Sequence, residues 1–75
     1  MSVKWDKSSK QAGAWSYRAG REHGGGWSVE VFRTEEPGVV KWSSKGLKNR
    51  RNALARGCFM ANKFHHDELN NRGAA

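Results

Sequence analysis

The chain has one cysteine, one proline and no apolar run that approaches the length of a membrane span. A single cysteine cannot form a disulfide within the chain, so Cys58 fits a reducing compartment. A spanning helix needs about 20 consecutive apolar residues, and no signal-peptide apolar segment opens the sequence. We therefore expect a cytoplasmic protein with no membrane partner.

Acidic residues are missing from one long stretch of these 75 residues. Residues 1–37 hold six basic and five acidic side chains, whereas residues 41–63 hold seven basic side chains and no Asp or Glu. The net charge of +7 is therefore concentrated in one stretch. Concentrated positive charge predicts a polyanionic partner, most simply nucleic acid.

Aromatic side chains compensate for the small size of the chain. A domain of this length buries only about 60% of the surface that its unfolded chain exposes. Four Trp, one Tyr and three Phe are present, and each ring can bury about 150–250 Å². Homodimer formation is a second route to stability, which the sequence leaves open.

Three segments with alternating apolar residues predict β-strands at residues 14–19, 27–33 and 39–43. Glycines at 24–26 and the pair Pro37-Gly38 favour tight turns between them, which predicts antiparallel neighbours. Phe32 is predicted on the sheet face opposite the core, either as an exposed ring or covered by the N-terminal segment with Trp5. The predicted core face carries Trp15, Tyr17, Trp27, Val29, Val31, Val40 and Trp42.

An amphipathic helix is predicted after the third strand, because apolar and small residues recur at three- and four-residue spacing up to Phe64. Ser43, Ser44 or Asn49 can cap its start, and we expect it to end near His66. The predicted fold class is α+β, with a three-stranded antiparallel sheet packed on one C-terminal helix. This domain spans residues 14–66, between flexible segments at 1–13 and 67–75.

Gly57 lies on the apolar side of the predicted helix. A mid-helix glycine costs about 1 kcal/mol relative to alanine. Its position therefore predicts that the helix backbone closely approaches a bulky ring, such as that of Trp42 or Trp27.

Basic residues gather at the start of the predicted helix, where the helix dipole makes each cation unfavourable by about 0.3–1 kcal/mol. Stability alone would favour acidic residues there, and an arriving phosphate would meet free backbone N–H groups as well as the cations. The alternative is a solvated helix face with a generic positive bias. The predicted nucleic-acid-binding residues are Lys41, Lys45, Lys48, Arg50, Arg51, Arg56, Lys63 and Arg18.

The run WSSKGLKNRRNALAR at residues 42–56 resembles the junction between the third strand and the last helix of double-stranded-RNA-binding domains. His23, before a glycine-rich turn, is similar to the His-bearing loop of that family. The resemblance covers about residues 17–64 and lacks the family's first helix. It implies phosphate contacts by Lys45, Lys48, Arg50 and Arg51, and packing by the small residues Ala53 and Ala55.

A second resemblance is to the three-stranded-sheet-plus-helix DNA-binding domains of phage integrases and plant AP2 proteins, which read the major groove with the sheet. It implies that the open sheet face bears the contacts, although Glu30 in the middle of that face opposes this interpretation. The residues concerned are Arg18, Lys41, Ser16, Ser28 and Ser43.

Other chemistry has little support in the sequence. No nucleophile–base pair can be assigned, and Cys58 on the apolar stripe is expected to be an inert buried thiol. His65 and His66 match no structural zinc spacing. We therefore expect no enzyme activity, no metal and no cofactor.

Two specific functions remain as hypotheses, beside a basic structural domain with only weak non-specific affinity for polyanions. The first is a small nucleic-acid-binding protein that contacts the phosphate backbone through the start of its helix. The second is a phage-type interaction module or inhibitor that binds an acidic surface of a host protein. The open sheet face with Phe32 and Val39, the sheet edge, or the exposed ring of Phe59 would supply its anchor.

Overall fold

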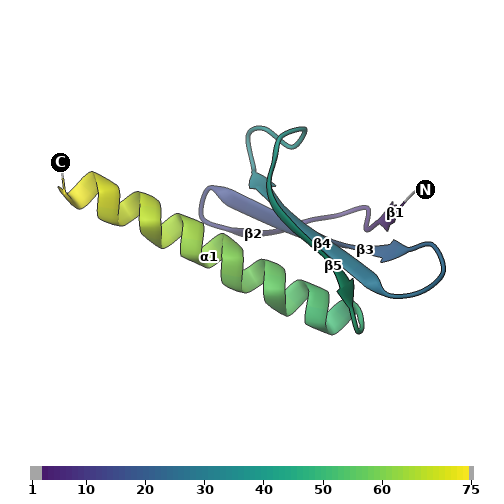
Figure 1. Ribbon diagram of the computed structural model, residues 1–75. Helices are drawn as coiled ribbons and strands as arrows, with labels where there is room; N and C mark the ends of the chain where they lie inside the picture. The colour runs from purple at the N-terminus through teal and green to yellow at the C-terminus, as the bar shows by residue number, and fades with distance from the viewer. Residues whose placement is uncertain (1–2, 75) are drawn as a thin grey trace.

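A computed structural model describes the backbone of residues 3–74 and the side chains of residues 3–70. An antiparallel sheet packs against a single C-terminal helix (Figure 1), which confirms the predicted α+β class. The elements are β1 (Val3–Trp5), β2 (Lys10–Ala12), β3 (Trp15–Glu22), β4 (Trp27–Arg33), β5 (Val40–Leu47) and α1 (Arg50–Ala74).

The sheet has two more strands than the sequence pattern predicts. Its order is β1-β3-β4-β5, and β2 also pairs with β3. Trp5 of β1 lies opposite Gly20, whereas Ala12 of β2 lies opposite Trp15, so both short strands share one edge of β3. Each has only three residues and no alternation of apolar residues. Pairing with β3, which their own sequence pattern does not indicate, orders them as strands. Residues 3–5 and 10–12 therefore belong to the sheet.

Small residues on α1 let its backbone approach the sheet closely. Ala53, Gly57 and Ala61 follow at four-residue spacing and are buried. A Cβ atom added at Gly57 would lie 2.7 Å from Val29 Cγ2 and 2.9 Å from Tyr17 Cδ2. The predicted close approach to a ring is confirmed, but the ring is that of Tyr17 and not of Trp42 or Trp27.

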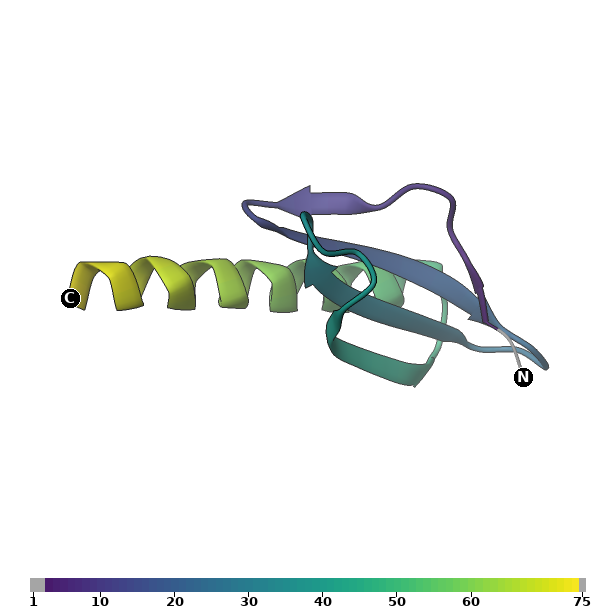
Figure 2. The same cartoon turned by 90° about the horizontal axis from the view of Figure 1, so that it is seen from above.

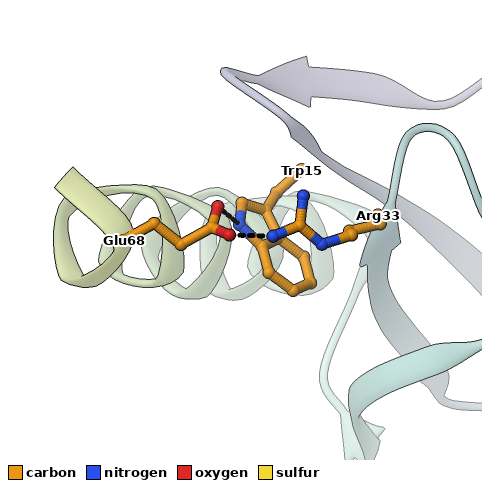
Figure 3. A network of polar contacts seen from close by, with 3 residues as sticks. All are labelled: Trp15, Arg33 and Glu68. Carbon is orange, nitrogen blue, oxygen red and sulfur yellow. Dashed lines mark hydrogen bonds and ion pairs between the residues drawn. The ribbon is translucent and has the colours of Figure 1, made fainter. Parts of the chain in front are cut away.

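A polar network ties the second half of α1 to the end of the sheet (Figure 3). Trp15 Nε1 donates a hydrogen bond of 2.8 Å to Glu68 Oε1, and Arg33 forms an ion pair with the other oxygen of that carboxylate. The predicted helix end near His66 is therefore wrong. The helix continues to Ala74 and extends beyond the sheet (Figure 2).

The sheet face opposite α1 is covered in part by the N-terminal strand. Phe32 is only 5% exposed. The Arg18 guanidinium lies 5.7 Å from the centre of its ring and 5.2 Å from that of Trp5, and it pairs with the buried Glu30. Phe32 is therefore not an exposed ring, and the alternative, in which the N-terminal segment with Trp5 packs over this part of the face, agrees with the structure.

An irregularity in β5 separates two residues that the alternation places on one face. Trp42 pairs with Val31, but Val40 pairs with Phe32, which leaves Lys41 as an extra residue between them. Val40 therefore shares the face of Phe32, opposite α1, and its predicted place beside Trp42 is wrong. A bulge of this kind changes the period of two on which the prediction depends.

We expect Gly57→Ala to destabilise the fold by about 1–3 kcal/mol, because overpacking against Val29 and Tyr17 outweighs the gain in helix propensity. Urea denaturation measures the change. Gly38→Ala is the control, since nothing lies within 4 Å of a Cβ at that position. A Gly57→Ala variant as stable as the parent would contradict the close contact.

We expect Glu68→Ala to lower the free energy of unfolding by about 1–2 kcal/mol, because it removes a charged hydrogen-bond acceptor that is about one-third exposed. Denaturation followed by tryptophan fluorescence measures this loss. The control variant is Asp67→Ala. Asp67 is exposed and belongs to none of the ion pairs found among residues 3–70. Equal stability of the two variants would show that the network does not hold the helix.

Candidate nucleic-acid interface

The start of α1 is capped by one side chain and has no acidic residue in its first turn. Asn49 Oδ1 accepts a hydrogen bond of 2.8 Å from the Asn52 amide, and the Asn49 carbonyl accepts one of 3.1 Å from the Ala53 amide. The amides of Arg50 and Arg51 make no hydrogen bond within the described part of the chain. The helix start therefore offers two backbone donors to an anion.

Three exposed cations surround these donors, and we call Lys48, Arg50 and Arg51 the helix-start cluster. Arg50 Nη2 lies 3.0 Å from Asp6 Oδ2. Both groups are accessible to solvent, and an exposed pair of this kind contributes only about 0.2–1 kcal/mol. Lys48 and Arg51 belong to none of the ion pairs found among residues 3–70.

A groove of about 470 Å³ begins beside this cluster, between the end of β5 and the outer side of α1. The ring of Phe59 in this groove is 65% exposed. Lys63 follows Phe59 by four residues, which places it on the same side of the helix. The groove is lined by Leu47, Asn52, Ala55, Arg56 and Phe59.

The remaining predicted residues lie apart from the groove. Arg18 is held by Glu30 on the sheet face opposite α1. Lys45 is exposed and lies on that same face, beside Ser28 and Glu30. Lys41 Nζ lies 5.9 Å from the centre of the Phe64 ring, near the Glu68 network.

The structure thus brings together five of the eight predicted residues, namely Lys48, Arg50, Arg51, Arg56 and Lys63. It does not place Arg18, Lys41 and Lys45 with them. The sequence pattern indicates that Phe59 is exposed, but it does not indicate the groove. The groove forms because the turn between β5 and α1 brings Leu47 beside the helix.

Cys58 is half-buried and packs against the core cluster that contains Tyr17. Burial raises the pKa of Tyr17 from 10.0 to about 12, and a hydrogen bond with Cys58 adds to this effect. Asn62 Nδ2 also approaches the sulfur, at 3.4 Å. Tyr17 belongs to the core beneath α1, and Cys58 packs against that core, whereas Asn62 is exposed. Within the described residues, no three His, Cys, Asp or Glu side chains converge as metal ligands would.

Comparison with known proteins gives no match to a family model, to a curated protein or to a solved structure. The resemblances to double-stranded-RNA-binding domains and to integrase-type domains therefore stay predictions. In the part of the chain that the structure describes, β1 and β2 precede the central strands where the RNA-binding family has a helix. Also within that part, no helix has the length and apolar character that crossing a membrane requires.

Tyr17 is the only tyrosine, so the absorbance of tyrosinate reports it alone. We expect a midpoint near pH 12 in the folded protein and near 10 in the unfolded chain. Because the folded pKa is raised, its contribution to stability is complete below pH 10 and is lost as the pH rises towards 12. Cys58→Ala should lower the pKa only in part, since burial is its larger cause. A midpoint near pH 10, with the fold intact by circular dichroism, would contradict this packing.

Proposed function

We propose that the protein binds nucleic acid through phosphate contacts centred on the helix-start cluster and continued by Arg56 and Lys63. One observation carries this proposal. Exposed cations surround two free backbone donors at a helix start that contains no acidic residue. Each feature is mildly unfavourable for the free protein, and each becomes favourable when an anion binds.

The distribution of acidic groups supports the same function. The ion pairs found in the described part of the chain use Glu30, Glu68 and Asp6, and only Asp6 touches the cluster. Lys48, Arg51 and Arg56 therefore keep their full positive field towards solvent. A phosphate backbone supplies negative charges in the regular series that such a group can contact.

Phe59 gives the surface a second kind of contact. Its exposed ring lies in the groove that Arg56 also lines, and an exposed aromatic ring is a platform on which bases stack. Such stacking requires bases that are unpaired or at an end, which favours single strands over continuous duplex.

An acidic protein is the second candidate partner, and the exposed Phe59 favours it, because a ring amid cations can anchor a protein interface. Phe32, the other predicted anchor, is buried. The same cations would then steer the protein towards an Asp- or Glu-rich surface.

We expect the triple variant Lys48→Ala, Arg51→Ala, Arg56→Ala to weaken nucleic-acid binding strongly and to reduce its salt dependence. On single strands the slope of log affinity against log salt should be less steep by about 2, that is about 0.7 for each lost contact. Fluorescence anisotropy with labelled oligonucleotides at several salt concentrations measures both effects. The control variant Lys4→Ala, Lys7→Ala, Lys10→Ala removes the same charge from exposed positions in and around β1 and β2.

Equal loss of affinity in the two triple variants would show that only net charge matters and would contradict a defined surface. Affinity that does not change with salt would contradict phosphate contacts altogether. A stoichiometric acidic protein retained from a nuclease-treated extract, with no oligonucleotide binding, would favour the protein partner instead.

A further inference from the structure

A pocket of about 210 Å³ opens on the sheet face opposite α1, away from the groove. Its walls come from three strands, with Val3 and Trp5 on β1, Ser28 and Glu30 on β4, and Val40 and Lys45 on β5. Pockets for drug-sized ligands measure roughly 300–1,000 Å³. This pocket therefore suits a group of the size of one ring system.

The missing side chain of Gly20 lets the aromatic wall of the pocket form. A Cβ atom at Gly20 would lie 2.5 Å from Trp5 Cε3 and 2.5 Å from Val3 Cγ1. The indole of Trp5 thus rests directly on β3, and Arg18 lies over its ring at 5.2 Å. The position of this ring is therefore determined by the fold before any ligand arrives.

Ser28 supplies an unused polar group in the wall of the pocket. Ser28 is 3% exposed, and its Oγ has no hydrogen-bond partner among the described residues. Buried hydroxyl groups are nearly always partnered. The chemistry of Ser28 thus points to a group on a ligand that accepts or donates a hydrogen bond.

Two charged groups complete the pocket. Glu30 stands two residues from Ser28 on the same face of β4, about 7 Å along the strand, and its negative charge is balanced by Arg18. Lys45 is exposed and offers a cation to solvent at the pocket's edge. A flat apolar wall, a hydroxyl, a carboxylate and an outer cation fit a planar heterocycle with a hydrogen-bonding edge and an attached phosphate.

Guanine fits these groups better than the other bases. Its N1–H and N2–H groups are adjacent donors, which a carboxylate accepts side by side, and its O6 accepts from a hydroxyl. Unpaired bases are read in this way, by stacking on an aromatic ring and hydrogen bonds to their edges. We propose that this pocket binds one unpaired guanine of a single-stranded nucleic acid, with Trp5 as the stacking surface, Glu30 and Ser28 on the base edge and Lys45 on its phosphate. This inference rests on the proposed function and specifies its ligand.

The experiment compares a ten-residue oligouridine with the same strand carrying one central guanosine. Anisotropy gives the two affinities, and the indole N–H resonance of Trp5, assigned by its absence in Trp5→Phe, reports the pocket. We expect tighter binding of the guanosine strand and a shift of the Trp5 resonance with that strand and with guanosine monophosphate. The monophosphates of adenosine, cytidine and uridine should shift it less.

Ser28→Ala separates a ligand-binding role from a structural one. Because Ser28 Oγ has no hydrogen-bond partner within residues 3–70, we expect the variant to melt at least as high as the parent. Its preference for guanosine should nevertheless fall about fivefold, which is the size of one hydrogen bond. Ser8→Ala, in the exposed segment between β1 and β2, is the matched control and should change neither property.

The outcomes distinguish this inference from the proposed function. Salt-dependent binding with equal affinity for both strands and an unmoved Trp5 resonance would overturn the pocket and leave the function standing. Preference for another base would overturn the assignment of guanine. A Trp5 shift with guanosine monophosphate but no binding of either strand would make this a free-nucleotide site and overturn both proposals.

Discussion

The close contact between one helix and one sheet is the constraint on which this structure depends. A chain of this length buries too little surface to tolerate a gap, so α1 presents Ala53, Gly57 and Ala61 to the large side chains of the sheet. Gly57 has no room for a Cβ atom beside Val29 and Tyr17. This stripe sets the rotation of the helix about its axis. The basic side of α1 is consequently the side that faces solvent, and its start lies beside the end of β5.

On the opposite face of the sheet, too, a residue without a side chain lets a large ring approach the backbone. Trp5 rests on Gly20, and Arg18 lies between the rings of Trp5 and Phe32 while it pairs with Glu30. Burying the Glu30 carboxylate is costly and is offset only by close pairing and further contacts. Its partner Arg18 keeps about one-third of its side chain exposed and also contacts the two rings. This arrangement brings β1 onto the sheet and, as a consequence, forms a walled pocket.

The alternation of apolar residues in β3 and β4 and the spacing of apolar residues in the helix were sufficient to predict the α+β class and the core face. Both patterns depend only on residues that are close together in the sequence. The other features arise from contacts between distant segments. Glu68, near the end of the helix, accepts a hydrogen bond from Trp15, which is 53 positions away in the sequence. The extra residue Lys41 in β5 turns the side chain of Val40 to the other face of the sheet. The predicted basic residues were equally visible in the sequence, but their separation onto different faces of the molecule was not. Arg18 is occupied by Glu30 in the folded chain, which no local pattern could reveal.

The two proposed contact surfaces constrain the kind of ligand that could use both. The pocket opens opposite α1, whereas the helix-start cluster lies at the other layer, and the chain from Lys45 to Arg51 connects them around the end of β5. The molecule measures only 21 × 17 Å across its long axis. Duplex DNA is stiff over about 500 Å, so it cannot bend around an object of this width without large strain. A single strand can bend at each phosphate, and a ligand that fills the pocket and also contacts Arg51 must therefore be single-stranded along that path.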